Sequence, residues 1–498
     1  MTKFFLDQHG CAKNQVDGEL IIDRLIKKGL VQVFDASQAD LIVVNSCGFI
    51  ESAKKESLDA VISAKNAYPK AKLLLAGCLA ERYADVFKTE LPEADAILGN
   101  GDLSQIDGVI DAIEKNERPI VKKPQKGVCG GDRNMLLSFR GSAYIKITEG
   151  CNNNCTYCAI PLIRGELRSR KASEITDEIR ALLAKGIFEF NLVGQDLAAY
   201  GTGREDNVFG EGRSPLNCKD GKPSPLSRLL KEISAIEGDF WIRLLYIHPD
   251  HFTDDILPVI AADKRILPYF DIPFQTGDDK MIRAMNRTGS AESYIDIAKR
   301  IRAVLPEAAL RTTFLTGFAG ETKEAQENTE RFIRELNFDW SGCFPYSVEE
   351  DTPGALMKNQ VPHKTAELRA KRLEEIQAQI TRERLASRTG KEYDVLVEEI
   401  VEGDEGLAIA RAWFQAPEVD GSVVISYDRD NPEENKIVQS GRLVRVRITS
   451  SGAVDLNGEF VSDSPLNAHR AQSTLEFAEE RINENARGES LATSQNQQ

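Results

Sequence analysis

The N-terminal part of the chain alternates short apolar runs with amphipathic stretches. Apolar runs occupy residues 3–6, 41–44 and 73–76, and amphipathic stretches occupy residues 18–28 and 52–67. Short apolar runs bounded by turn residues are typical of buried strands, whereas amphipathic stretches of this length are typical of helices. Strands that alternate with helices predict a parallel, doubly wound α/β sheet with helices on both faces.

A second series of strand candidates, separated by helical stretches, begins near residue 137. Six βα-like units in succession predict a full or partial barrel of parallel strands, with the functional groups at the end where the strands finish. The polar stretch 202–225, rich in Gly and Pro, is expected to be a surface loop. The six strands are expected at residues 144–147, 189–192, 241–246, 269–272, 310–315 and 340–345.

The C-terminal part changes character, because short strands and turns follow one another between residues 377 and 461. This pattern predicts a small β-barrel, with strands at 393–397, 407–412, 422–427 and 443–448. The end of the chain is expected to form one polar helix and a disordered tail. The expected units are an N-terminal domain at 2–118, a core at 137–375, a β-barrel at 377–463 and a tail at 464–498.

The composition is that of a multidomain protein. Of 498 residues, 41% are hydrophobic and 28% are charged, and the net charge is -15. This charge opposes a broad nucleic-acid footprint, because phosphate contacts need a basic surface. Residues 391–463 hold seven Lys or Arg and sixteen Asp or Glu, a net charge of -9. An acidic barrel would suit a basic protein partner, although acidic surfaces also simply keep proteins in solution.

The strongest chemical motif is a set of three cysteines, Cys151, Cys155 and Cys158, which we call the motif cysteines. They follow the alternating run 143–147 in C-x3-C-x2-C spacing. This spacing suits three corners of a [4Fe-4S] cube, whose fourth iron would stay open to a ligand from outside the protein. The motif therefore predicts a cluster that performs chemistry.

Two other interpretations of this motif are weaker. A structural zinc site usually adds a second cysteine pair or a histidine at fixed spacing, and none of the five histidines is close to the motif in sequence. Disulfides are less expected still, because nine cysteines is an odd number. No signal peptide or apolar membrane span is evident, so the cytoplasm is the expected compartment and no membrane partner is expected.

Three more cysteines, Cys11, Cys47 and Cys78, each follow a predicted strand of the N-terminal sheet; we call them the strand-end cysteines. The carboxyl ends of parallel strands lie along one edge, so these thiols are expected to converge there. A free cysteine is often only a small buried apolar residue. The same placement after three successive strands nevertheless favours a second three-cysteine cluster. The remaining cysteines fit neither group and are expected to be structural or incidental: Cys129, Cys218 and Cys343.

Four stretches that include all six of these cysteines resemble a known family. The chain resembles the radical S-adenosylmethionine (SAM) methylthiotransferases, and within them the branch that modifies ribosomal protein S12 (uS12). The resemblance implies an N-terminal methylthiotransferase domain, a radical SAM core and a C-terminal TRAM β-barrel. The stretch that resembles the TRAM barrel is residues 415–421. The four stretches are residues 10–17, 45–50, 76–83 and 146–170.

A sister family that methylthiolates adenosine in tRNA is the alternative. Its members typically carry Gln-Met-Asn where this chain has Ala-Lys-Asn at 12–14, and Cys-Ser where it has Cys-Gly at 47–48. They also carry an arginine after a Tyr-Ser-Pro step, where this chain has Tyr-Ser-Val-Glu-Glu at 346–350. These differences and the acidic barrel favour the uS12 branch.

The resemblance implies two [4Fe-4S] clusters and SAM as cofactors. The cluster on the motif cysteines would cleave SAM to a radical that takes a hydrogen from the β-carbon of an aspartate in uS12, a position that no general base could activate. The cluster on the strand-end cysteines would carry the sulfur, which a second SAM would methylate. The implied partners are uS12, free or in the small ribosomal subunit, a flavodoxin- or ferredoxin-like electron donor and a sulfur source.

Four further residues are expected to contact the cofactor: Gln195, Asp196, Arg243 and Gly317. Three of them have an ordinary alternative role. Asp196 could cap a helix, Arg243 could form an ion pair, and Gly317 could belong to a plain strand-to-helix connection. An iron-sulfur scaffold without catalysis is the alternative from another functional class.

Overall fold

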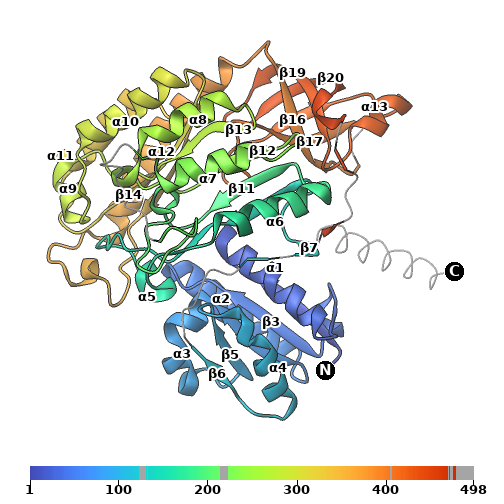
Figure 1. Cartoon of the computed structure of the whole chain (residues 1–498). Coiled ribbons are helices and arrows are strands. Elements are labelled where there is room, and N and C mark those ends of the chain that lie inside the picture. Colours follow the sequence, from blue (N-terminus) through green and yellow to red (C-terminus); the bar gives the residue numbers. More distant parts are fainter. Residues whose placement is uncertain are drawn as a thin grey trace.

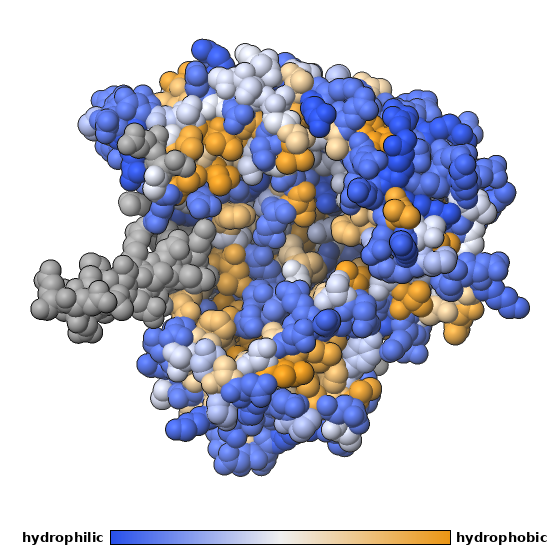
Figure 2. All heavy atoms as spheres, turned by 180° about the vertical axis from the view of Figure 1, so that it is seen from behind, coloured by the Kyte–Doolittle hydropathy of each residue, from blue (hydrophilic) through white to orange (hydrophobic). Residues whose placement is uncertain are grey.

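The computed structural model describes residues 1–122, 130–131, 133–212, 222–403, 406–468, 470–471 and 475–477. In chain order they form an N-terminal sheet domain, a larger core of parallel strands and helices, and a small barrel (Figure 1). Hydrophilic residues cover most of the face in Figure 2, and hydrophobic residues gather toward its middle. Among the described residues, no helix has both the length and the apolar character that crossing a membrane requires.

The N-terminal domain is a parallel sheet with helices on both faces, as the alternating pattern predicts. Its elements are β1 (Lys3–Gln8), α1 (Ala12–Lys27), β2 (Val31–Gln32), η1 (Ala36–Gln38), β3 (Leu41–Ser46), α2 (Glu51–Ala67), β4 (Lys72–Gly77), α3 (Cys78–Glu90), β5 (Ala96–Gly99), η2 (Leu103–Gln105), α4 (Ile106–Glu114) and β6 (Ile120–Val121). The strand order is β2-β1-β3-β4-β5-β6. Helices α1 and α4 pack on one face, and α2 and α3 pack on the other. The first helix begins at Ala12, earlier than expected, so that Cys11 is its N-cap residue.

The core contains an open parallel sheet in the order β15-β14-β13-β12-β11-β8, and all six expected strands are present. Because this sheet does not close on itself, the structure has the partial form of the predicted barrel, not the full one. The elements are β7 (Met135–Leu136), β8 (Ser142–Lys146), β9 (Thr148–Glu149), α5 (Ile160–Arg164), β10 (Arg168–Ser169), α6 (Ala172–Ala184), β11 (Glu189–Val193), η3 (Leu197–Ala199), α7 (Pro225–Ser234), β12 (Trp241–Leu244), η4 (Pro249–His251), η5 (Asp254–Ile256), α8 (Leu257–Ala262), β13 (Ile266–Asp271), α9 (Asp279–Ala284), α10 (Ala291–Val304), β14 (Ala309–Thr316), α11 (Lys323–Leu336), β15 (Trp340–Pro345), η6 (Pro353–Leu356) and α12 (His363–Ala386).

The two faces of the core sheet pack against different parts of the molecule. Side chains alternate between faces along each strand. Ile145 and Phe190 point to the face that the core helices cover, in one apolar cluster. Tyr144 and Trp241 point to the other face, where α1 and the C-terminal barrel complete a second cluster. The face of the open sheet that the core helices leave free is therefore covered by α1 and the C-terminal barrel.

The C-terminal barrel is closed, with strand order β16-β17-β18-β20-β19. Its elements are β16 (Glu392–Ile400), β17 (Leu407–Ala412), β18 (Val423–Ser426), α13 (Pro432–Ile437), β19 (Leu443–Ser451) and β20 (Leu456–Asp463), followed by η7 (Pro465–Asn467) and β21 (Glu476–Phe477). Four of its strands are the expected ones. The strand β20 was not expected, because Leu456 and Gly458 are its only buried residues and no apolar run marks it.

The expected surface loop at 202–225 is wrong for its first part. Asp206 and Val208 are buried, and the Asp206 carboxylate accepts a hydrogen bond from the amide of Ser169 (2.9 Å). Because the Asp206 carboxylate bonds to backbone amides, this part of the polar stretch packs against the core. Residues 213–221 lie outside the described residues.

The expected tail of one polar helix and disorder is also partly wrong. Its residues Glu476–Phe477 form β21, which pairs in parallel with β7 of the core. Leu475, just before this strand, is buried in the core. Residues 478–498 lie outside the described residues.

Candidate active site

The motif cysteines lie on the loop between β9 and α5. All three are free thiols, with Cys155 buried and the other two half-buried. The amide of Cys158 donates to the carbonyl of Cys155 (3.0 Å), and the amide of Asn153 donates to the sulfur of Cys151 (3.5 Å). Burial raises the pKa of Cys151 and of Cys158 to about 12, so both thiols keep their protons at neutral pH while no metal is bound. Since metals bind the thiolate form, metal binding would release these protons.

The strand-end cysteines share one edge of the N-terminal sheet. Cys11, Cys47 and Cys78 follow β1, β3 and β4, which are neighbours in the sheet. A Cβ added to Gly10 would lie 3.1 Å from the Cβ of Cys47, so the first two loops are in close contact. Burial and the charges of Cys78 and Cys11 raise the pKa of Cys47 to about 12. The three thiols are thus close enough to influence one another electrostatically.

The motif cysteines supply three thiol donors, the kind of ligand that holds an iron-sulfur cluster. N–H groups that donate to cysteine sulfur, as Asn153 does to Cys151, are typical of iron-sulfur sites.

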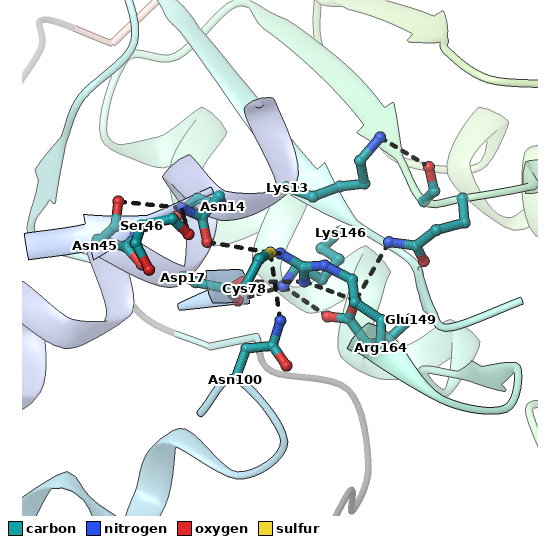
Figure 3. Close-up of polar contacts among 12 residues, drawn as sticks. Lys13, Asn14, Asp17, Asn45, Ser46, Cys78, Asn100, Lys146, Glu149 and Arg164 are labelled. Carbon is teal, nitrogen blue, oxygen red and sulfur yellow. Dashed lines mark hydrogen bonds and ion pairs between the residues drawn. The ribbon is translucent and has the colours of Figure 1, made fainter. Parts of the chain in front are cut away.

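Four buried charged side chains, which we call the charged network, lie between the N-terminal domain and the core (Figure 3). Arg164 donates from Nη2 to the sulfur of Cys78 (3.1 Å). Its Nη1 donates to Asp17 (3.1 Å) and Glu149 (2.7 Å). Lys146 pairs with the same two carboxylates, 2.8 Å from Glu149. Two cations and two anions compensate each other, as buried charges require, and tie α1 to the core beside a strand-end cysteine.

Gln195 and Asp196 follow β11 and lie beside the motif cysteines. Gln195 donates to Glu149 of the charged network (3.3 Å). Asp196, with Cys151, lines a cavity of about 210 Å³, and a second cavity of about 610 Å³ also borders Cys151. Burial would raise the pKa of Asp196, but a hydrogen bond from His251 (2.5 Å) outweighs it and lowers this pKa. Asp196 is therefore an ionised group beside Cys151, in the wall of the smaller cavity.

Arg243 and Gly317 have contacts elsewhere. Arg243 is fully buried and donates to Glu189 (2.8 Å) and to the carbonyl of Trp413 (2.7 Å), so it joins the core to the barrel. Gly317 has a φ of 75°, and a Cβ there would lie 2.2 Å from the Cβ of Ala366 on α12. Among the described residues that line the two cavities, neither appears.

His248 lies at the site although it is far from the motif in sequence. Its Nε2 is 3.8 Å from the sulfur of Cys155. Burial lowers the pKa of His248 to about 3, so its ring is neutral. The available sequence signal was a pair of histidines, His248 and His251, shortly after a predicted core strand. Arg164 lies within the matched stretch 146–170, but spacing alone does not indicate its contact with Cys78.

Three family models match the chain in the order that the fold shows. Uncharacterized protein family UPF0004 matches residues 3–99, the Radical SAM superfamily matches 145–333, and the TRAM domain matches 389–461. The core sheet and its cysteine motif therefore define a radical SAM enzyme, a class that uses SAM and an iron-sulfur cluster.

The chain is also similar over most of its length to relatives named ribosomal protein uS12 methylthiotransferase RimO. The relative from Treponema denticola is 52% identical, and the match covers 91% of this chain and 99% of the relative. The relative from Carboxydothermus hydrogenoformans is 35% identical, with 93% and 100% covered. The chain belongs to this RimO family of methylthiotransferases. Among solved structures, the radical SAM methyltransferase TsrM from Kitasatospora setae is 13% identical with a TM-score of 0.49, covering 94% of this chain and 86% of that chain.

Proposed function

We propose that this chain transfers a methylthio group to the β-carbon of an aspartate in ribosomal protein uS12. The observation that carries the proposal is the pair of three-cysteine groups at the contact between the N-terminal domain and the core, joined by the charged network. The relatives named for uS12 methylthiotransfer support the same substrate.

In this proposal each cysteine group holds a [4Fe-4S] cluster. The clusters and SAM would supply radical cleavage of SAM at the motif cysteines and a sulfur carrier at the strand-end cysteines. The residues of the chain position these groups. Asp196 and Gln195 border the space beside Cys151, and Arg164 orients the sulfur of Cys78. Cys78 and Cys155 are buried, which keeps water away from these two sulfur atoms.

The proposal also includes partners. The first cluster needs electrons at low potential, for which a flavodoxin- or ferredoxin-like donor is suited, and the second needs a source of sulfur. The barrel carries a net charge of -9 over residues 391–463. An acidic barrel repels phosphate and attracts a basic protein, which supports a ribosomal protein as the substrate, free or in the small subunit.

Cysteine variants of the reconstituted protein test the assignment of the two groups. We expect Cys155→Ala to abolish reductive cleavage of SAM to 5'-deoxyadenosine. Cys47→Ala should keep most of that cleavage and lose methylthiolation of a uS12 peptide. Cys343→Ala, a buried cysteine on β15 outside both groups, is the matched control and should keep both. Methylthiolation by Cys47→Ala would refute a sulfur carrier at the strand-end cysteines.

A further inference from the structure

Apolar side chains reach the surface where the N-terminal domain meets the core (Figure 1). Phe49 and Ile50 lie two and three residues after Cys47, just before α2, and each is 36% exposed. Val348 lies just past β15 of the core and is 54% exposed. We call Phe49, Ile50 and Val348 the boundary patch, because the two domains contribute to it together.

Hydrogen bonds hold the two segments of the boundary patch side by side. The amide of Glu51 donates to the hydroxyl of Ser347 (3.5 Å). Arg82 of α3 donates to the carbonyl of Gly48 (3.0 Å) and to the carbonyl of Glu350 (2.9 Å). Single exposed apolar residues are ordinary, but a group that two domains build together indicates an interaction surface.

The charges exposed around the boundary patch are mostly negative. The nearby cations Lys54 and Arg82 have little exposed side-chain surface, and both pair with the buried Glu349 (3.1 and 2.8 Å). Their charges are therefore used inside the protein. The charged side chains exposed in segments 48–56 and 347–351 are four carboxylates, Glu51, Glu56, Glu350 and Asp351, and one ammonium, Lys55.

A basic protein segment that also carries apolar side chains fits this surface. The exposed carboxylates attract its cations and repel the phosphates of a nucleic acid. The apolar side chains supply contact area that loses water on binding, inside a polar rim. Because the patch begins two residues past Cys47, a segment bound to it lies next to the strand-end cysteines.

We propose that the boundary patch docks a basic, partly apolar segment of the protein substrate, an inference that rests on the proposed function. Docking there brings the neighbouring part of the substrate to the strand-end cysteines, where the proposed function places the sulfur. Both domains contact the segment, so the patch positions the substrate between the two cysteine groups.

One variant from each domain tests the apolar part of the patch. Methylthiolation of purified uS12 is measured on cluster-loaded protein, and we expect Ile50→Ser and Val348→Ser each to raise the KM for uS12 on the order of 10-fold with little change in kcat. Both side chains are exposed, so both variants should unfold at the temperature of the wild type. Val31→Ser is the control. Val31 is 59% exposed and pairs with Lys3 at the start of β1, at the opposite end of the sheet from the cysteines.

Ionic strength tests the charged rim separately. Since salt screens exposed charges, the KM of the wild type for uS12 should rise with salt. The double variant Glu350→Gln, Asp351→Asn should have a higher KM at low salt and a weaker salt dependence. Asparagine suits residue 351, whose φ is 62°. The control is Glu324→Gln, Glu327→Gln, two exposed carboxylates on α11, which should keep the salt dependence of the wild type.

Several outcomes would overturn the proposal. An unchanged KM for uS12 in both serine variants would exclude docking on the patch, and an unchanged salt dependence in the rim variant would exclude a basic segment. Slower reduction by flavodoxin with an unchanged KM would assign the patch to the electron donor. A dimeric wild type with monomeric serine variants and an unchanged KM would assign it to a second copy of the chain. A wild type that cleaves SAM but does not modify uS12 would instead refute the proposed function, and this inference with it.

Discussion

The sulfur of Cys78 has polar neighbours that no spacing pattern reveals. Arg164 donates to it at 3.1 Å, and the side-chain amide of Asn100 donates to it at 3.4 Å. N–H donors draw electron density from a cysteine ligand, and this raises the reduction potential of the cluster that the ligand holds. The two cysteine groups thus differ in surroundings, since the motif cysteines receive a backbone donor from Asn153.

Replacing Arg164 with Lys keeps the charge and removes the planar fork that reaches Cys78 and two carboxylates together. We expect the midpoint potential of the cluster proposed at the strand-end cysteines to fall, because one N–H···S bond is lost, and that of the cluster proposed at the motif cysteines to stay. Redox titration followed by EPR measures both potentials. Arg180→Lys, an exposed arginine on α6, is the control. Equal potentials in Arg164→Lys and the wild type would show that this hydrogen bond has no tuning role.

The cysteines and their companions differ in how far sequence alone predicts them. Cysteines at fixed spacing, or at the end of each successive strand, can be recognised from the local sequence. Lys13 and Arg164 lie inside recognisable stretches, but their partners come from other domains, so their roles depend on tertiary contacts. For Arg243 the sequence was misleading. Its place in a core strand suggested a cofactor contact, but its partners are Glu189 of the core strand β11 and Trp413 of the barrel.

The contact between the core sheet and the barrel depends on a buried carboxylate. Glu189, at the start of β11, lies 2.8 Å from Arg243 and 2.7 Å from Arg411 of the barrel. All three side chains are nearly inaccessible to water. Such a triad is stable only when it is complete, because loss of one partner leaves the others charged and buried. This requirement explains why a charged residue stands in an otherwise apolar interface.

Replacing Glu189 with Gln should therefore destabilise the chain by about 3–5 kcal/mol. Chemical denaturation followed by tryptophan fluorescence measures this, because all three tryptophans lie in the cluster between core and barrel: Trp241, Trp340 and Trp413. Glu335→Gln, a half-exposed residue on α11, should change the stability by less than about 0.5 kcal/mol. A loss in Glu189→Gln as small as in this control would contradict the account of the triad.

The same triad gives the stability a pH dependence. Burial would raise the pKa of Glu189, but Arg411 and Arg243 outweigh it and hold this pKa well below the ordinary 4.5. The stabilisation is therefore present above pH 4.5 and is lost as the pH falls below it. We expect the difference between the wild type and Glu189→Gln to shrink in acid.

Strands with a clear apolar pattern were predictable, and short or mostly exposed ones were not. Four of the core strands, β8, β11, β12 and β13, are buried on both faces, as is typical of parallel strands, and apolar residues mark them in the sequence. In β20 most positions face solvent, and β21 spans two residues, too few to form a pattern. The sequence therefore predicted the barrel, but not the fifth strand that closes it.

The domains are held together at the two cysteine groups by further ion pairs. Glu349, just past β15, is buried and accepts hydrogen bonds from Lys54 of α2 (3.1 Å) and Arg82 of α3 (2.8 Å). Together with the charged network, these contacts fix the N-terminal sheet against the carboxyl ends of the core strands. A shared orientation of this kind is what transfer from one cluster to a radical formed at another would require.

Mass spectrometry of uS12 from cells with and without this gene tests the central proposal most directly. The account predicts a methylthio adduct on one aspartate of uS12 that is present with the gene and absent without it, while the adenosines of tRNA are unchanged. An unmodified uS12 in both strains, together with altered adenosine in tRNA, would contradict the account and assign the chain the tRNA reaction instead.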